Sequence, residues 1–343
     1  MKSYFVFFTA ILFTSSVVSA QPLIDPSVKG KEIGGSYRLR VQPKKGDMFH
    51  YKTTSKTIIS VKNDDDLLTE LMPNLKPNEK SSYLITHYLT NVVRMIRPDS
   101  AIDMFVTIDS THIVQDVDGI QHTFTSTLPE NYHDPLFFGS AAYTGIQFGW
   151  MVDQFGNSKD IYGYYPIVDR LFEDIEDSLV TTDTRNNISQ EVYSTLERLL
   201  YREVPGFSMD FLAKDSTDES KFDENRATWS TMEFPMQKEI KNKVQRLEEG
   251  AGKKYAVTEA EITYTPKERV IEEKEYHSTL PKYSFLNKQS EYIDIESGMI
   301  LYNKIQEEES YAVKIESTLP EKAGKNFVTV YHRKGETIVE MMK

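Results

Sequence analysis

Apolar and polar residues alternate with a period of two along both halves of the chain. Such alternation is typical of β-strands with one face on a core and the other towards water. It favours an antiparallel sheet, because parallel strands covered on both faces give continuous apolar runs. The sequence therefore predicts antiparallel β-structure over residues 36–165 and again over residues 251–343. The clearest apolar sets are Ile102, Met104, Val106 and Ile108, and then Ile146, Phe148, Trp150 and Val152.

Turns that contain glycine separate several of these stretches. Asp118-Gly119 lies between two alternating segments and is a strong hairpin signal. Phe155-Gly156-Asn157 marks a second turn. Ser297-Gly298 and Lys334-Gly335 each stand between two further alternating runs, so the sequence predicts a hairpin at both.

The period changes after Pro166, and residues 166–250 are predicted to form a central helical insert. We expect the first helix to pack on the sheet face that bears Phe148 and Trp150. Asn187 is a candidate cap for the second helix. The fold class is therefore α+β, and the later β region either completes the first sheet or forms a second lobe. The three helical stripes are Ile167, Val168, Leu171, Phe172, Ile175 and Leu179; Ile188, Val192, Leu196, Leu199 and Leu200; and Met236, Ile240, Val244 and Leu247.

Residues 1–20 have the pattern of a secretory signal peptide. Lys2 precedes an apolar stretch from Tyr4 to Phe13, and Ala20 places a small residue at the cleavage position. An uncleaved anchor is the alternative. Residues 21–35, with two prolines and three glycines, are expected to be a flexible lead. The sequence thus predicts an exported protein, periplasmic or secreted, with no integral membrane segment after cleavage.

Composition narrows the class of function. The chain has no cysteine, which excludes disulfides, thiol chemistry and a bacterial lipoprotein anchor, so stability must come from a buried core. Loss of Lys2 with the signal peptide leaves 39 basic against 52 acidic residues, a formal net charge of −13. Such an acidic chain is poorly suited to bind nucleic acid or anionic lipid surfaces.

Two short motifs resemble ion or phosphate sites but are incomplete. The segment Asp116 to Gly119 resembles part of a calcium loop, yet Val114 and Thr125 stand where its first and last ligands should be. The run from Gly250 to Lys254 lacks the first glycine and the hydroxyl of a phosphate-binding loop. We interpret the first as a hairpin and the second as a turn after a helix, and expect no metal and no cofactor.

No catalytic signature is present. The chain has no Gly-x-Ser-x-Gly elbow and no His-Glu-x-x-His zinc motif, and no catalytic residue is assigned. His133-Asp134 is a loop pair that could coordinate an ion or transfer a proton, although a solvated loop is the simpler interpretation. A triad assembled from distant residues stays possible, because triads are defined by geometry. The run Glu307 to Glu309 is interpreted as solvated, or as protection of a sheet edge.

Aromatic residues provide the remaining hint of a binding site. Rings with polar tips often line sites for sugars or amphipathic ligands. Packing within a sheet is the simpler alternative, because tyrosine favours strands. No individual ligand-binding residue is assigned. The residues concerned are Tyr162, Tyr164 and Tyr165, with Phe137, Phe138 and Tyr143 close in sequence.

Three segments give the chain a resemblance to a group of uncharacterised exported bacterial β-rich proteins. They are Tyr37 to Tyr51 with Lys45-Gly46-Asp47, the segment Val152 to Gly156, and the segment Tyr292 to Gly298. Similar units of strand, turn and strand occur in lipoprotein-carrier-like half-barrels. That resemblance implies a curved antiparallel sheet, with helices on its concave side, that holds acyl chains. Fold analogy alone does not establish function.

These observations lead to three hypotheses. The first is a non-catalytic exported protein that binds an amphipathic or apolar ligand, such as a lipid, or an envelope partner. The second is a cell-envelope assembly or structural protein that acts through its surface. The third is a hydrolase with dispersed catalytic residues. A closed apolar cavity would favour the first hypothesis. A flat, solid-cored sheet with an exposed apolar patch would favour the second, and converging polar groups with perturbed pKa values in a cleft would favour the third.

Overall fold

The computed structural model describes residues 21–64, 78–128, 137–154, 156, 158–173, 175, 180–202, 212–214, 219–227, 234–272, 276–318 and 326–343. They form one antiparallel sheet of 14 strands, a two-stranded sheet and three helices. The helices are α2 (Phe138–Tyr143), α3 (Tyr165–Leu171) and α4 (Thr182–Arg202). The strands of the first β region are β1 (Lys31–Glu32), β2 (Ser36–Arg38), β3 (Met48–Asp64), β4 (Asn78–Ile96), β5 (Ile102–Val117), β6 (Ile120–Thr125), β7 (Gln147–Val152) and β8 (Ser158–Tyr162). Those that follow the helices are β9 (Leu212–Lys214), β10 (Glu219–Ala227), β11 (Pro235–Gly250), β12 (Lys253–Pro266), β13 (Val270–Glu272), β14 (Tyr276–Asp294), β15 (Ile300–Ser317) and β16 (Asn326–Met341).

The large sheet joins the two β regions of the chain. Its strands follow the order β1-β11-β12-β14-β15-β16-β3-β4-β5-β7-β8, and β10, β13 and β6 pair with β11, β14 and β5. The last long strand, β16, pairs with the first, β3, from Val328 opposite Asp64 to Met341 opposite Tyr51. The later β region therefore completes the first sheet and does not form a separate lobe.

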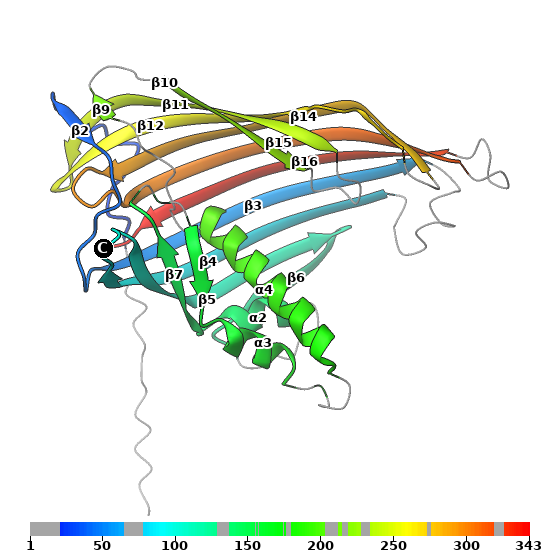
Figure 1. Cartoon of the computed structure of the whole chain (residues 1–343), viewed down its shortest axis with the longest axis horizontal. Helices are drawn as coiled ribbons and strands as arrows, with labels where there is room; N and C mark the ends of the chain where they lie inside the picture. Colours follow the sequence, from blue (N-terminus) through cyan, green and yellow to red (C-terminus); the bar gives the residue numbers. More distant parts are fainter. Residues whose placement is uncertain are drawn as a thin grey trace, which may run out of the picture.

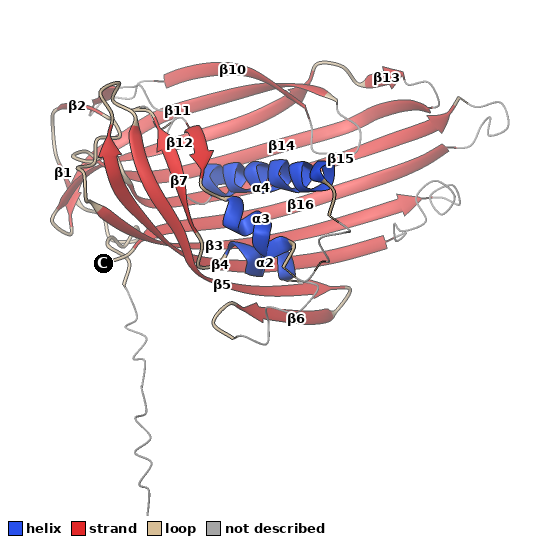
Figure 2. Ribbon diagram, turned by 60° about the horizontal axis from the view of Figure 1, so that its bottom comes forward, coloured by secondary structure: helices blue, strands red, loops and turns tan. Residues whose placement is uncertain are grey.

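The sheet is curled and not closed, and the helices lie on its concave side (Figures 1 and 2). We call this concave side the inner face and the opposite side the outer face. The pairing shifts register at several places, among them Tyr88/Leu89 between β4 and β5 and Val244/Arg246 between β11 and β12. Such bulges increase the local bend and twist of a strand. The fold is therefore mostly antiparallel β with a few helices, as predicted.

The main core fills the inner face at one end of the long strands, which we call the packed end. There Ile167 and Val168 of α3 share one buried cluster with Phe148 and Trp150 of β7. This confirms the predicted packing of the first helix. The helix ends at Leu171, Ile175 is exposed, and the predicted Leu179 lies outside the described residues. Helix α4 adds Val192, Leu196 and Leu200 to the same cluster.

The second helix begins earlier than the sequence predicted. It starts at Thr182, not after Asn187, because Thr181 satisfies its first turn. The Thr181 hydroxyl accepts a hydrogen bond from the backbone N–H of Thr184 at 3.1 Å and contacts the Thr184 hydroxyl at 2.8 Å. This is the role of an N-cap side chain.

The predicted third helix is wrong, since Met236, Ile240, Val244 and Leu247 belong to strand β11. Met236, Ile240 and Val244 are spaced by four residues. Residues at that spacing lie on one face of a strand as well as on one face of a helix. The bulge between Val244 and Arg246 then returns Leu247 to the same inner face. The central insert is therefore helical only in its first part, and β9, β10 and β11 follow α4.

The expected flexible lead is instead bound to the fold. The backbone N–H of Leu23 donates to the carbonyl of Met341 at 2.7 Å, and Ile24 is buried in the main core. Lys31 and Glu32 pair with the end of β11. This segment covers the outer face at the packed end, where the buried Tyr292 ring is tilted against that of Tyr255 and meets that of Tyr302 edge to face.

Most predicted turns are correct. Asp118 and Gly119 adopt positive φ angles of 53° and 86°, as a tight hairpin between β5 and β6 requires. Gly156 lies in the turn between β7 and β8. The hairpin predicted at Lys334-Gly335 is wrong, because β16 runs straight through it. The alternating residues before Gly335 (Phe327, Thr329, Tyr331) and after it (Thr337, Val339, Met341) all have odd numbers. One strand can therefore contain both sets on the same face.

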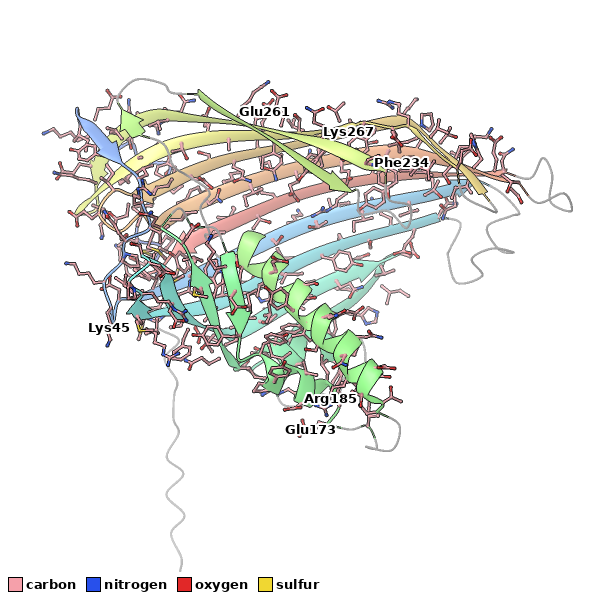
Figure 3. The ribbon with its side chains drawn as sticks, in the orientation of Figure 1. Lys45, Glu173, Arg185, Phe234, Glu261 and Lys267 are labelled. Carbon is pink, nitrogen blue, oxygen red and sulfur yellow. The ribbon has the colours of Figure 1, made fainter. Side chains whose placement is uncertain are left out.

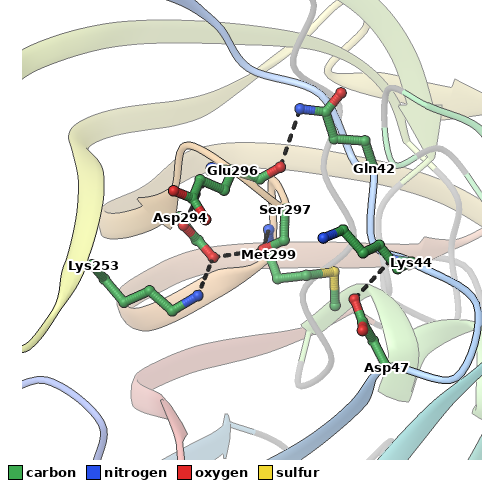
Figure 4. Close-up of polar contacts among 8 residues, drawn as sticks. All are labelled: Gln42, Lys44, Asp47, Lys253, Asp294, Glu296, Ser297 and Met299. Atoms are coloured by element: carbon green, nitrogen blue, oxygen red, sulfur yellow. Dashed lines mark hydrogen bonds and ion pairs between the residues drawn. The ribbon is translucent and has the colours of Figure 1, made fainter.

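The turn at Ser297-Gly298 joins β14 to β15, and the segment before β3 that contains Arg40 and Gln42 packs closely against this turn (Figure 4). Asp294 accepts hydrogen bonds from Lys253 Nζ at 2.9 Å and Ser297 Oγ at 2.8 Å. The Gln42 side chain donates to the carbonyl of Glu296 at 3.1 Å. A Cβ on Gly298 would lie 1.8 Å from the Arg40 carbonyl oxygen, so this close approach requires glycine.

Candidate ligand-binding face

Next to the packed end, polar side chains replace the apolar core on the inner face, and a second buried apolar cluster, which includes Phe234, Met236 and Val313, lies farther along it. Paired neighbours form one row across the sheet, in which only one side chain is apolar. We call this set the polar row. From β12 to β5 it consists of Thr258, Glu291, Asn303, Val339, Thr53, His87 and Thr111.

Glu291 is a buried carboxylate in the polar row. Its oxygens accept hydrogen bonds from Thr258 Oγ1 at 3.3 Å and from Asn303 Nδ2 at 3.2 Å. Burial raises the pKa of Glu291 to about 7, and the hydrogen bond from Thr258 opposes part of that shift. The other amide atom of Asn303, Oδ1, is buried without a hydrogen-bond partner. A buried acceptor without a donor costs about 1–3 kcal/mol, so this position suits a donor from a bound molecule.

A group of charged and amide side chains lies farther along the inner face. Arg333 Nη2 is 3.0 Å from Glu307 Oε2, and Asn287 Nδ2 donates to Glu307 Oε1 at 2.9 Å. Glu309 lies directly opposite Arg333 in the β15–β16 pairing and is also buried. Gly335 stands opposite Glu307, and a Cβ there would lie 3.8 Å from Glu307 Oε2, an ordinary contact distance. We call Asn287, Glu307, Glu309 and Arg333 the charged belt.

Five rings adjoin the charged belt, and we call them the aromatic patch. The Tyr311 and Tyr331 rings stack with centroids 4.7 Å apart, and Tyr264 meets Phe285 edge to face, also at 4.7 Å. Tyr283 donates a hydrogen bond to Glu309 Oε1 at 3.5 Å. Burial raises the pKa of the Tyr283 phenol, and the negative charge of Glu309 raises it further. Tyr264, Tyr283 and Tyr311 also pack against the second buried cluster, so apolar side chains of the fold cover part of these rings.

The outer face of the same strands has a different character. Lys304 and Glu336 form an ion pair at 2.9 Å there, and Lys314 pairs with Glu316 at 2.6 Å. Glu308 is exposed on this face between the inward-facing Glu307 and Glu309. Charged side chains in pairs are typical of a surface in contact with water. The two faces of the sheet therefore differ in chemistry as well as in curvature.

The two incomplete motifs lie in hairpins. Asp116 Oδ1 accepts the backbone N–H of Gly119 at 2.9 Å, and Asp118 Oδ1 accepts that of Lys80 at 3.2 Å, so both carboxylates hold backbone at the β5–β6 turn. The glycine-rich run forms the hairpin between β11 and β12, with positive φ at Ala251 and Gly252. It is a turn, as predicted, but it follows a strand. His133-Asp134 lies outside the described residues.

The aromatic cluster proposed from the sequence is divided between separate places. The Tyr162 hydroxyl donates to Asp103 beside Arg94. Tyr164 stacks on Tyr165 with ring centroids 5.2 Å apart, and Phe137 packs on Phe124 at 5.5 Å in a small core under α2. The Tyr162 contact joins β8 to β5, whereas the contacts of Tyr164 and Phe137 lie in the helical layer, so the three do not converge on one site. Figure 3 places the exposed Glu173 and Arg185 at the end of this layer that points away from the sheet.

One arrangement superficially resembles a catalytic relay. The Thr90 hydroxyl contacts His50 Nδ1 at 2.9 Å and donates its proton to Asp109 Oδ2 at 2.6 Å. Because that proton points at the carboxylate, His50 cannot act as the base that activates the hydroxyl. The contacts lie on the outer face and are solvent-exposed. They do not form a nucleophile and base pair.

The sequence did not identify Glu307 and Glu309 as inner-face residues. The charge run predicts solvated or edge residues, yet β15 is a central strand paired with β14 and β16. A signal was available, because alternate residues of a strand face opposite sides and only Glu308 had to face water. The missing fact was which strands pair with β15.

Comparisons with known proteins provide little further guidance. No protein-family model matches the chain, and no curated protein matches it. A solved structure of lipovitellin, from work on its lipid–protein interactions, is similar to this chain with a TM-score of 0.41 and 9% sequence identity. The similarity covers 88% of this chain and only 26% of the lipovitellin chain. An outer membrane channel from Pseudomonas putida F1 has a TM-score of 0.19 and 5% identity, over 92% of this chain and 99% of the channel. Neither likeness establishes a shared fold. Among the described residues, no helix is long and apolar enough to cross a membrane.

Proposed function

We propose that this chain is a non-catalytic exported binding protein that holds an amphipathic molecule against the inner face of its curled sheet. The observation that supports this most is the contrast between the two faces. The inner face carries the aromatic patch and, farther along the strands, buried polar side chains, of which Tyr51, Asn91 and Asn303 have atoms without a hydrogen-bond partner among the described residues. The outer face carries charged pairs. A ligand with an apolar part and a polar head matches the inner face.

Native mass spectrometry of the protein, purified without detergent, tests this proposal directly. A co-purified molecule with an acyl or other apolar part is the expected result. If nothing co-purifies and the uncharged fluorophore N-phenylnaphthylamine does not bind, the proposal is wrong.

Two tyrosines of β4 offer a matched test of which face binds. Tyr83 faces inward and Tyr88 faces outward, where it is 41% exposed. Tyr83→Ser is expected to weaken the binding of N-phenylnaphthylamine roughly fivefold to tenfold, because a ring contact contributes about 1 kcal/mol or more. Tyr88→Ser should leave the dissociation constant unchanged in a fluorescence titration. Equal effects of the two variants would contradict binding on the inner face.

A role in envelope assembly through the outer surface is the second candidate. Ile58, Leu84 and Val330 are exposed apolar side chains on the adjacent strands β3, β4 and β16 of the outer face. Lys56 pairs directly with Leu84, and Lys62 pairs directly with Val330. This candidate gains support if no small molecule co-purifies and neither tyrosine variant changes binding of the fluorophore.

Export itself is proposed from residues 1–20. Gln21, the first residue after the proposed cleavage point, already contacts the fold, since its carbonyl accepts the backbone N–H of Lys343 at 3.0 Å. N-terminal sequencing of the exported protein is expected to begin at Gln21, or to be blocked by its cyclisation, which mass spectrometry would reveal. A protein that still begins with Met1 would contradict the periplasmic or secreted location.

A further inference from the structure

We propose that two copies of this chain pair through strand β6, edge to edge and antiparallel, so that their two sheets become continuous. The inference goes beyond the proposed function, because it concerns the rim of the sheet and not its inner face. It depends on the lack of edge protection at β6, on the direction of the backbone groups of this strand and on the exposed side chain of Ile120.

Strand β6 is the one edge of the described sheets that has no protection against pairing. It lies at the rim, beyond β5, and no other described strand pairs with it (Figure 2). Natural edge strands are usually protected by shortness, charge, proline or a bulge. The six residues of β6 include no Asp, Glu, Lys, Arg or Pro, and they pair with β5 without a register shift. Such an edge is a ready template for another strand.

The other edges of the described sheets are protected in this way. Strands β1, β2, β9 and β13 are only two or three residues long. Five of the nine residues of β10 are charged, and β8 carries Lys159 and Asp160. The segment from Ile120 to Leu128 has no Asp, Glu, Lys or Arg, in a chain with 27% charged residues. The contrast indicates that the β6 edge is kept open for a partner strand.

The backbone of β6 directs hydrogen-bonding groups towards its open side. Just after the strand, the backbone N–H of Ser126 donates to a carbonyl of β5 at 2.9 Å, so the even-numbered residues bond to β5. Gln121 and Thr123 therefore point their N–H and C=O groups away from β5, and both side chains are exposed. The carbonyl of Thr125 accepts the N–H of Leu128 at 3.1 Å. The open edge thus ends before Thr125.

A two-fold axis at His122 makes this open edge complementary to itself. Gln121 then lies opposite Thr123 of the second copy, and each such pair exchanges both of its backbone hydrogen bonds. Ile120, whose side chain is 64% exposed, comes to lie beside Phe124 of the second copy and is partly removed from water. No carboxylate or cationic side chain of β6 opposes another, although the chain as a whole is acidic. This matched register favours a second copy over an unrelated strand.

Sedimentation velocity and hydrogen exchange of the full mature chain at pH 8 test the proposal without any substitution. A reversible dimer with a dissociation constant on the order of 100 μM is expected, because an interface of one strand from each copy is small. Exchange at the amides of Gln121 and Thr123 should slow as the protein concentration rises from about 5 to about 500 μM. A chain that stays monomeric over this range overturns the proposal, and so does a dimer in which exchange at β6 does not change.

A substitution at the exposed Thr123 locates the interface. Thr123→Lys is expected to raise the dissociation constant about tenfold or more, since a lysine on an edge strand opposes pairing. Thr265→Lys adds the same charge at an exposed threonine of β12 and should leave the dissociation constant unchanged. Equal effects of the two variants would overturn the assignment to β6.

A second substitution tests the register. Gln121→Glu, added to Thr123→Lys, places a carboxylate opposite each lysine across the two-fold axis. The dissociation constant should then return to within about threefold of the wild-type value, because opposite charges in a cross-strand pair attract. Circular dichroism checks that each variant is folded. A folded double variant that pairs no better than Thr123→Lys would overturn the axis at His122.

Discussion

Replacing Trp150 by alanine is expected to destabilise the protein by about 3–5 kcal/mol, as is typical when a large buried ring is lost. Trp150 is 1% exposed and belongs to the core cluster that joins β5 and β7 to α3 and α4. Its indole Nε1–H also donates to Ser158 Oγ at 3.1 Å, so the substitution removes a hydrogen bond together with the packing. Urea denaturation at neutral pH measures the change.

Tyr165 provides the control for this experiment. It lies in α3 close to the same core but is 62% exposed. Tyr165→Ala should cost about 0.5 kcal/mol or less, as most surface substitutions do. If both variants kept the stability of the wild type, the core at the packed end would not hold the helical layer on the sheet.

Periodicity predicted the long strands and the first helix because it reports local geometry. Ile102 to Ile108 and Phe148 to Val152 alternate as a strand with one buried face must, and those residues face the core. The failure at Met236 to Leu247 has the same origin. A spacing of four residues satisfies both periods, and only pairing with β12 shows which one applies.

The candidate site depends on pairing between distant segments, which the sequence pattern does not contain. Glu291, Asn303 and Thr53 are neighbours in the polar row because β14, β15, β16 and β3 lie side by side. The contact between β16 and β3 joins the two ends of the chain. Without it, Glu307 to Glu309 could be interpreted only as a charged run, and the inner and outer faces could not be distinguished.

The pH dependence of stability is expected to reveal Glu291. Burial raises its pKa from an ordinary value of 4.5 to about 7. Below pH 4.5 the carboxyl is protonated in both the folded and the unfolded chain, so it imposes no cost. Between these values the unfolded chain ionises first, and the stability of the fold falls as the pH rises. Above about pH 7 the full cost of the buried charge remains, which for this shift is about 3 kcal/mol.

Glu291→Gln removes this titration and keeps the size of the side chain. The amide introduced by the substitution could still accept from Thr258 Oγ1, and a half-turn of the Asn303 amide would direct its unpartnered Oδ1 towards the new N–H₂ donor. Relative to wild type, the free energy of unfolding of this variant should rise by about 3 kcal/mol between pH 4 and pH 8.5. Urea midpoints at the two pH values measure it.

The matched control is Glu308→Gln on the outer face, whose exposed carboxylate lies on the adjacent strand β15. The free energy of unfolding of this control variant relative to wild type should change by less than about 0.5 kcal/mol over the same pH range. This comparison cancels the titration of the carboxyls that both variants retain. If the free energy of unfolding of Glu291→Gln relative to wild type did not change between the two pH values, the folded protein would already supply this carboxylate with the donors it needs. The polar row would then be a structural network, complete without a ligand.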